Sequence, residues 1–190
     1  MQEGLNLFSL SNTSKIYLMD NEGKALHKWN INYSKKQQNK FRGFALQGNN
    51  NLIFIDYLQG IGLADNESDL AWFKNIRAHH EVILIENNTI LTLDRKERNV
   101  TIDNETLLIE DEILVWLDLE GDIVKEISFF DSVKDTLDLK KLTDKTKRFY
   151  KPEKGLPYNI FHVNSLEFLK KIIIEFLKKA ISYSQREILI

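Results

Sequence analysis

The chain has 190 residues, of which 43% are hydrophobic and 28% are charged, a composition that is typical of a globular protein and excludes wholesale disorder. Its 26 basic residues are dispersed among 28 acidic ones and the formal net charge is −2, so we expect no basic face that would bind nucleic acid. Cysteine is absent, which excludes disulfides, thiolate zinc sites and cysteine nucleophiles.

A repeated pattern of strand, Asp-x-Glu-Gly or Asp-x-Glu-Ser, and strand organises the chain. Its copies span residues 16–29, 61–72 and 114–127. Asp20, Asp65 and Asp118 are expected to fold their carboxylates back onto the turn backbone, and glycine in the first and third turns tolerates a positive φ. Ser68 takes the glycine position in the middle copy, which makes that turn the least regular. The pattern predicts three tight β-hairpins.

Hairpins of a second kind lie between these repeats. Asparagine pairs at residues 49–50 and 87–88 separate apolar runs, and asparagine readily adopts left-handed backbone conformations. Residues 108–113 are predicted to form a looser hairpin of this kind. The asparagine turns are 38 residues apart, and the second and third aspartate turns are 53 apart. This spacing suits units of four short strands, one with an enlarged loop, which are typical of β-propeller blades.

The sequence therefore predicts an all-β fold built as a single partial β-propeller domain. A β-sandwich or a meander is the alternative, and internal repetition favours the propeller. The predicted blades are residues 4–40, 41–76, 79–130 and 162–190. Residues 131–158 form an insertion, with a short helix near 131–150. Residues 166–180 have the apolar spacing of a helix, although the propeller pattern places strands near 163–169 and 181–190.

Three of the four histidines lie where a predicted blade begins. His79 and His80 precede one strand, and His162 opens a His-Val-Asn-Ser motif that includes Asn164. Because inner strands start at the central channel of a propeller, these side chains are expected to converge there. Imidazole at such a place can serve as acid, base, nucleophile, metal ligand or donor to an anion, or it can bond loop carbonyls structurally. His27 is expected to face solvent.

Arg186 lies on the last predicted strand. Its guanidinium can bind sulfate or phosphate oxygens if it points into the channel, whereas an isolated arginine is more often a surface residue. No carboxylate has obvious spacing to complete a metal site with the histidines, so we predict no metal. Glycine-rich phosphate loops and nucleophile elbows are absent, which disfavours nucleotide-dependent chemistry, and no cofactor is predicted.

Taken together, four segments resemble the bacterial arylsulfotransferases (aryl-sulfate sulfotransferases), over about residues 4–169. These segments are residues 17–29, the strand pair 63–72 with His79-His80-Glu81, residues 113–131, and His162-Val-Asn-Ser165. The resemblance implies a six-bladed propeller, of which about three blades are visible. Its channel would bind an aryl sulfate and pass the sulfuryl group to a histidine and then to a phenolic acceptor, without a nucleotide donor. It also implies that His162 and Arg186 stabilise the transition state and that His79, His80 and Asn164 bind the substrate.

The chain also departs from the family's pattern. The family's nucleophilic histidine belongs to a later blade, and no histidine follows His162. We therefore expect an incomplete and inactive part of an arylsulfotransferase-like propeller, which can self-associate through open blade edges. The alternative is a non-catalytic propeller that binds a partner or small ligand.

The sequence contains no recognisable signal peptide and no apolar run near the roughly 20 residues of a membrane helix. As written, it predicts a cytoplasmic protein without a membrane segment. Because family members are typically exported, the resemblance implies a periplasmic or other extracytoplasmic location if the N-terminus is incomplete.

Overall fold

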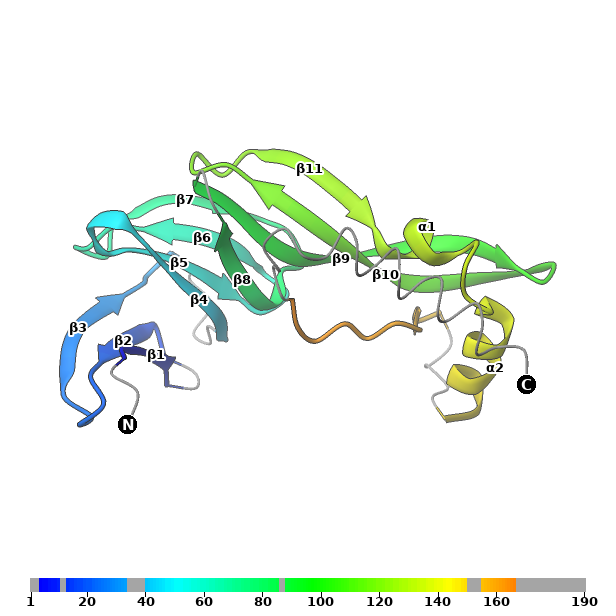
Figure 1. The fold of residues 1–190 in the computed structure, drawn as a ribbon, viewed down its shortest axis with the longest axis horizontal. Coiled ribbons are helices and arrows are strands. Elements are labelled where there is room, and N and C mark those ends of the chain that lie inside the picture. Colours follow the sequence, from blue (N-terminus) through cyan, green and yellow to red (C-terminus); the bar gives the residue numbers. More distant parts are fainter. Residues whose placement is uncertain (1–3, 11–12, 34–39, 86–87, 150–154, 167–190) are drawn as a thin grey trace.

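The computed structural model describes residues 4–10, 13–33, 40–85, 88–149 and 155–166. Three antiparallel sheets follow one another along the chain, as Figure 1 shows. The predicted all-β class is therefore confirmed, with two helices beside the third sheet. Among the described residues, no helix is long and apolar enough to cross a membrane.

Each sheet is a meander of consecutive strands. Sheet I consists of β1 (Asn6–Ser9), β2 (Lys15–Met19) and β3 (Ala25–Asn30). Sheet II consists of β4 (Phe41–Gln47), β5 (Asn51–Asp56), β6 (Gly60–Ala64) and β7 (Leu70–Lys74), with the 3-10 turn η1 (Gly48–Asn50) after β4. Sheet III consists of β8 (His79–Ile85), β9 (Thr89–Ile102), β10 (Glu105–Leu117) and β11 (Ile123–Ser128), with the short β12 (Tyr158–Asn159) parallel to β10.

The three aspartate turns form as predicted and have the same geometry. In each, an aspartate Oδ1 accepts a hydrogen bond from the backbone N–H four residues later, at 2.8–2.9 Å for Asp20, Asp65 and Asp118. The residue before that N–H has a positive φ, which is 84° at Gly23 and Gly121 and 79° at Ser68. Serine is thus held in a conformation that favours glycine, which accounts for the irregular middle copy.

The asparagine turns also form, because Asn50 and Asn88 have φ values of 61° and 58°. The predicted hairpin at residues 108–113 is wrong. These residues lie inside β10, and the hairpin reverses at Asp103 and Asn104, with φ values of 49° and 65°. The long spacing between repeats therefore comes from two lengthened strands and not from an enlarged loop.

The sheets stack face to face, so that sheet II is buried on both sides. Along β5, Leu52 and Phe54 pack toward sheet I, whereas Ile53 and Ile55 pack toward sheet III. This alternation follows from the period of two in a β-strand. It also explains why residues 52–55 of β5 and all of β6 are apolar instead of alternating with polar residues.

Tryptophan side chains connect each sheet to the aspartate turn of the next. Trp29 Nε1 on β3 donates to the carbonyl of Asp65 at 3.1 Å, and Trp72 Nε1 on β7 donates to the carbonyl of Leu119 at 2.6 Å. A Cβ added to Gly121 would lie 2.6 Å from the Trp72 ring. The glycine therefore permits both the turn and the close packing of the tryptophan from the preceding sheet.

The outer halves of β9 and β10 extend beyond sheet III as a two-stranded arm (Figure 1). The helices α1 (Phe129–Val133) and α2 (Leu139–Phe149) pack on this arm around a separate apolar cluster, and they fall in the region where a short helix was expected. Residues 163–166 are not a strand, contrary to expectation. The rest of the predicted unit 162–190, including the helix at 167–180 and the strand at 181–190, lies outside the described residues.

Candidate functional site

The first strands of sheets II and III, β4 and β8, lie side by side, and both are irregular at the point of contact. The register of β4 shifts between Phe41 and Phe44, and that of β8 shifts between His79 and Val82. A Cβ added to Gly43 would lie 2.9 Å from the carbonyl oxygen of His80. Glycine at this position is therefore needed for the two strands to approach.

The β8 bulge sends the two neighbouring histidines into different environments. His79 is fully buried, and its Nε2 lies 2.8 Å from Glu112 Oε2. His80 has a φ of 59° and is only partly buried. Its ring contacts Tyr57 and His79 edge to face, with centroids 5.9 and 5.0 Å apart. The sequence left open which histidine is accessible, and the structure identifies His80.

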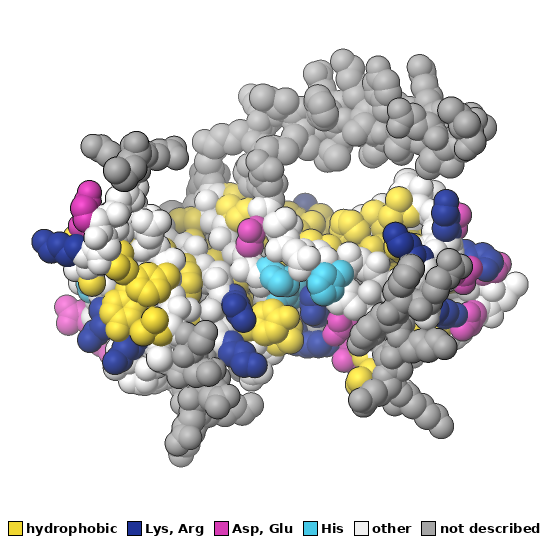
Figure 2. Space-filling model, turned by 90° about the horizontal axis from the view of Figure 1, so that it is seen from below, with side chains coloured by type: hydrophobic (Ala, Val, Ile, Leu, Met, Phe, Trp, Pro, Cys, Tyr) yellow, Lys and Arg dark blue, Asp and Glu magenta, His cyan; other side chains and the backbone are white. Residues whose placement is uncertain are grey.

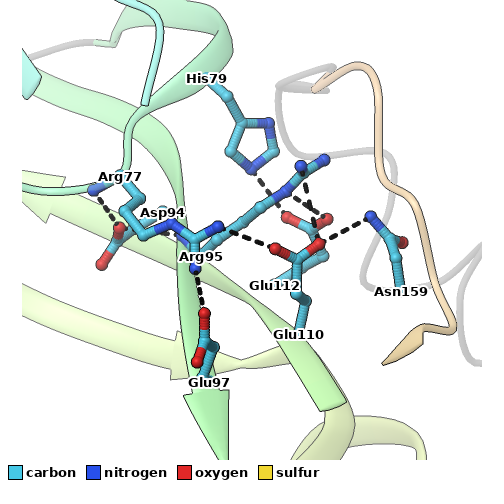
Figure 3. A network of polar contacts seen from close by, with 8 residues as sticks. All are labelled: Arg77, His79, Asp94, Arg95, Glu97, Glu110, Glu112 and Asn159. Carbon is cyan, nitrogen blue, oxygen red and sulfur yellow. Dashed lines mark hydrogen bonds and ion pairs between the residues drawn. The ribbon is translucent and has the colours of Figure 1, made fainter. Parts of the chain in front are cut away.

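Beneath His80 lies a network of buried charges that joins β8, β9 and β10 (Figure 3). Arg95 Nε donates to Glu112 Oε1 at 3.2 Å, and these two side chains are only 7% and 1% exposed. Arg77 Nη2 donates to Glu110 Oε1 at 2.8 Å, and Asn159 Nδ2 donates to Glu110 Oε2 at 3.1 Å. Ionised side chains stay buried only when paired, so Glu112 holds both Arg95 and His79 in place.

Two more buried carboxylates lie on the opposite face of the same hairpin. Asp94 Oδ1 accepts hydrogen bonds from the backbone N–H groups of Arg77 and Arg95, at 2.7 and 2.8 Å. Burial raises the pKa of Asp94, and these hydrogen bonds partly offset that rise. Asp111 accepts hydrogen bonds from Ser128 Oγ and the backbone N–H of Phe130, at 2.6 and 3.0 Å, and so fixes the start of α1.

His162 lies close enough to His80 to act on it electrostatically, although the two are far apart in the sequence. His162 is exposed and has a φ of 48°. The segment that follows is attached to β8, because the backbone N–H of Leu166 donates to Glu81 Oε2 at 2.6 Å. Histidine side chains accordingly gather near the centre of the face in Figure 2, beside basic and hydrophobic side chains. Asn164 is exposed in the same segment.

Burial lowers the pKa of His80, and the positive charges of His79, Arg95 and, to a smaller extent, His162 lower it further, while Glu112 opposes the shift. The lowered pKa favours a neutral imidazole, which can donate one hydrogen bond and offer one lone pair. An accessible neutral imidazole next to a second exposed imidazole is suited to binding an oxyanion or to accepting a transferred group.

The remaining predicted positions are less informative. Arg186 lies outside the described residues. His27 is half-buried against Trp29, with centroids 4.3 Å apart, and does not simply face solvent. No group of three or more histidine, aspartate or glutamate side chains in the described part of the chain is arranged to hold a metal ion.

Sequence reasoning missed Arg95, Glu110 and Glu112. Their signal was present as two runs of charge inside otherwise apolar strands, at residues 94–98 and 110–112. Opposite charges in two consecutive strands indicate cross-strand pairing, and Arg95 is indeed the register partner of Glu112.

A family model described as arylsulfotransferase (ASST) matches residues 1–179. No curated protein matches the chain.

Proposed function

The chain belongs to the arylsulfotransferase family, and from this we propose that it binds an aryl sulfate and takes part in nucleotide-independent transfer of the sulfuryl group to a phenol. The family supports sulfuryl transfer as the class of reaction, with aryl sulfates and phenols as the substrates. The proposal assigns the binding of the sulfuryl group to His80 and His162.

The observation that carries this assignment is that the exposed His162 lies close enough to the partly buried His80 to act on it electrostatically. Both have left-handed backbone conformations, with φ values of 59° and 48°. Such conformations are unfavourable for non-glycine residues and are enriched at functional sites. The hydrogen bond from Leu166 to Glu81 attaches the His162 segment to the strand that carries His80.

In the proposed reaction, the S–O bond to the aryl group breaks and an N–S bond to a histidine forms, while the aryl oxygen leaves as a phenol or phenolate. An acceptor phenol then attacks sulfur, the N–S bond breaks, and the acceptor loses its proton. Negative charge accumulates on the leaving oxygen and the sulfuryl oxygens. Hydrogen bonds from His80, His162 and Asn164 would stabilise this charge, and Arg186 is proposed to contribute a guanidinium.

We further propose that the three sheets are blades of a propeller. Two observations support this arrangement: β4 and β8 are the first strands of neighbouring sheets and lie side by side, and a tryptophan of each of the first two sheets bonds to the turn of the next. In a propeller, first strands line the channel, which would place His80 there.

The test is to incubate the full chain with 4-nitrophenyl sulfate and phenol, and to measure 4-nitrophenol release and phenyl sulfate formation. The variants His80→Asn and His162→Asn should each slow transfer by about 100-fold or more. The control is His27→Asn, because His27 lies on β3 against Trp29, and it should retain activity. Mass spectrometry of rapidly quenched protein would identify the histidine that carries the sulfuryl group.

Failure of the wild-type chain both to bind and to turn over the aryl sulfate would overturn the proposal. Binding without any transfer, and without sulfated histidine, would instead support the non-catalytic binding module. The expectation that this chain alone is inactive stays a prediction, which the same assay decides.

A further inference from the structure

Among the described residues, two nitrogen atoms of the buried network have no hydrogen-bond partner. They are Nδ1 of His79 and Nη2 of Arg95, which are buried in side chains that are 0% and 7% exposed. Within the described part of the chain, no group accepts a hydrogen bond from Nη2. A guanidinium carries its N–H donors at all times, and a buried donor of a charged group is rarely left unpaired in a native protein.

Both atoms belong to side chains that the same carboxylate holds. Glu112 contacts His79 through one oxygen and Arg95 through the other, so the two side chains are fixed relative to each other. Figure 3 shows the free nitrogen of His79 and the outer end of Arg95 on the side of the network that faces away from Glu97 and Glu112. The two unpaired nitrogens therefore belong to one part of the network, whose position Glu112 fixes.

This position lies next to the accessible histidine. The His79 and His80 rings are in contact, with centroids 5.0 Å apart, and Arg95 is close enough to act electrostatically on His80. Glu112 is itself engaged by both neighbours. Arg95 Nη2 is therefore a donor without a partner among the described residues, and Asn159 Oδ1 is the unpaired acceptor of the same network.

We propose that Arg95 forms an oxyanion subsite beside His79 and His80, in which Arg95 Nη2 donates to an oxygen of the substrate's sulfuryl group, with Glu112 as the positioning residue that holds both Arg95 and His79. This rests on the proposed function, and it assigns a guanidinium that neither the sequence pattern nor the family pattern identified. A tetrahedral oxyanion fits because it supplies only acceptors, whereas a metal cation would be repelled by Arg95.

The test measures binding of inorganic sulfate and of 4-nitrophenyl sulfate to the full chain by calorimetry, alongside sulfuryl transfer. The first variant is Arg95→Lys, which keeps the positive charge near Glu112 and removes the outer N–H groups. We expect the affinity for both ligands to decrease roughly tenfold or more, since a hydrogen bond between charged groups is lost.

The matched control is Arg98→Met, because Arg98 lies three residues along the same strand with its guanidinium bonded to Asp111, Ser128 and Asp131. It should leave both affinities unchanged. If Arg95→Lys binds like the wild type while transfer proceeds, the subsite is wrong and the proposed function stands. If the wild type neither binds nor transfers, both proposals fail.

Circular dichroism would show whether Arg95→Lys is folded. If it is not, the wild-type chain with ¹⁵N-labelled arginine provides the second measurement. Titration with sulfate should shift the side-chain resonance of a buried arginine, and the Arg98→Met variant should show the same shift. An arginine spectrum that does not respond to sulfate would overturn the subsite.

Discussion

Sheets II and III share one plan and differ in what fills them. Each is a four-stranded meander with an aspartate turn between its third and fourth strands. Each also has an aspartate on its second strand that accepts a backbone N–H from the start of the sheet: Asp56 from Lys40 and Asp94 from Arg77, both at 2.7 Å. In addition to this shared plan, sheet II holds packed aromatic rings, whereas sheet III holds histidine, arginine and glutamate.

The difference shows why the candidate site belongs to sheet III. The rings of Phe41 and Phe73 pack against the ring of Phe54, with centroids 5.3 and 6.2 Å from it. Such apolar groups are stabilised by burial and contact alone. Charged groups need a partner for every donor and acceptor, and a network that leaves two nitrogens unpaired is open to a ligand. The same scaffold therefore supports an aromatic interior in one sheet and an ionic interior in the next.

The largest expected effect is that of Glu112→Ala, which tests whether the ionic interior of sheet III is as integral as the aromatic interior of sheet II. The change leaves Arg95 and His79 buried without their shared carboxylate, and we expect a loss of about 3–5 kcal/mol in the free energy of unfolding. Phe54→Ala, the counterpart in sheet II, should lose a similar ~3–5 kcal/mol by creating a cavity. Urea denaturation followed by circular dichroism measures both.

A loss below about 1 kcal/mol for Glu112→Ala would show that the charges are not buried together as the structure has them. Added sulfate separates the two variants further. It should recover part of the stability of Glu112→Ala, by pairing with the exposed guanidinium, to a greater extent than it raises that of Phe54→Ala.

A smaller effect is expected from exchanging the turn residues of the two sheets. Gly121→Ser would place a Cβ 2.6 Å from the Trp72 ring at a φ of 84°, and should cost about 2–3 kcal/mol. Ser68→Gly should stay within about 0.5 kcal/mol of the wild type. Glycine would relieve the strain of the positive φ at this position. It would also remove the hydrogen bond that Ser68 Oγ accepts from the Asn30 N–H, and the two effects offset each other. Thermal unfolding of the pair is the measurement.

Equal losses at the two positions would contradict this comparison, since the turns have the same backbone and differ in what packs against them. A large loss for Ser68→Gly would show that its hydrogen bond to β3 contributes more than the strain removes.

The sequence was sufficient for the turns and insufficient for the site. Asp20, Asp65 and Asp118 act on backbone atoms within four residues, so a local pattern contains the whole interaction. The two-stranded arm of β9 and β10 could not be predicted from a local pattern of this kind. Charges at residues 110–112 resembled a turn, because the partners that allow them to be buried lie on other elements.

The histidine pair shows the same limit at a single bulge. His79 and His80 are adjacent and chemically identical, and the register shift of β8 alone decides that one pairs with Glu112 and the other contacts Tyr57. The shift depends on β4, where Gly43 allows the strands to meet. No local property of the two residues predicts their different roles.

The smallest expected effect is a pH dependence that sheet III should show and sheet II should not. The folded chain lowers the pKa of His80 below its ordinary value of 6.5, chiefly by burial, so the folded state binds this proton less readily than the unfolded state. Stability from the neutral form is therefore complete above pH 6.5 and decreases as the pH falls through 6.5 toward the lowered pKa. The urea concentration at which half of the protein is unfolded should decrease as the pH is lowered from about 7.5 to about 5.5. His80→Asn should make that decrease smaller.

The matched control is His27→Asn in sheet I, which leaves His79, His80 and His162 in place and should keep the wild-type slope. Carboxylates titrate mostly below this window and are common to all three proteins, so they do not change the comparison. A His80→Asn slope equal to that of the wild type would mean that protonation of His80 is not opposed in the folded state. In that case the neutral, accessible imidazole required for binding or accepting a sulfuryl group would have lost its physical basis, even if the fold around it were correct.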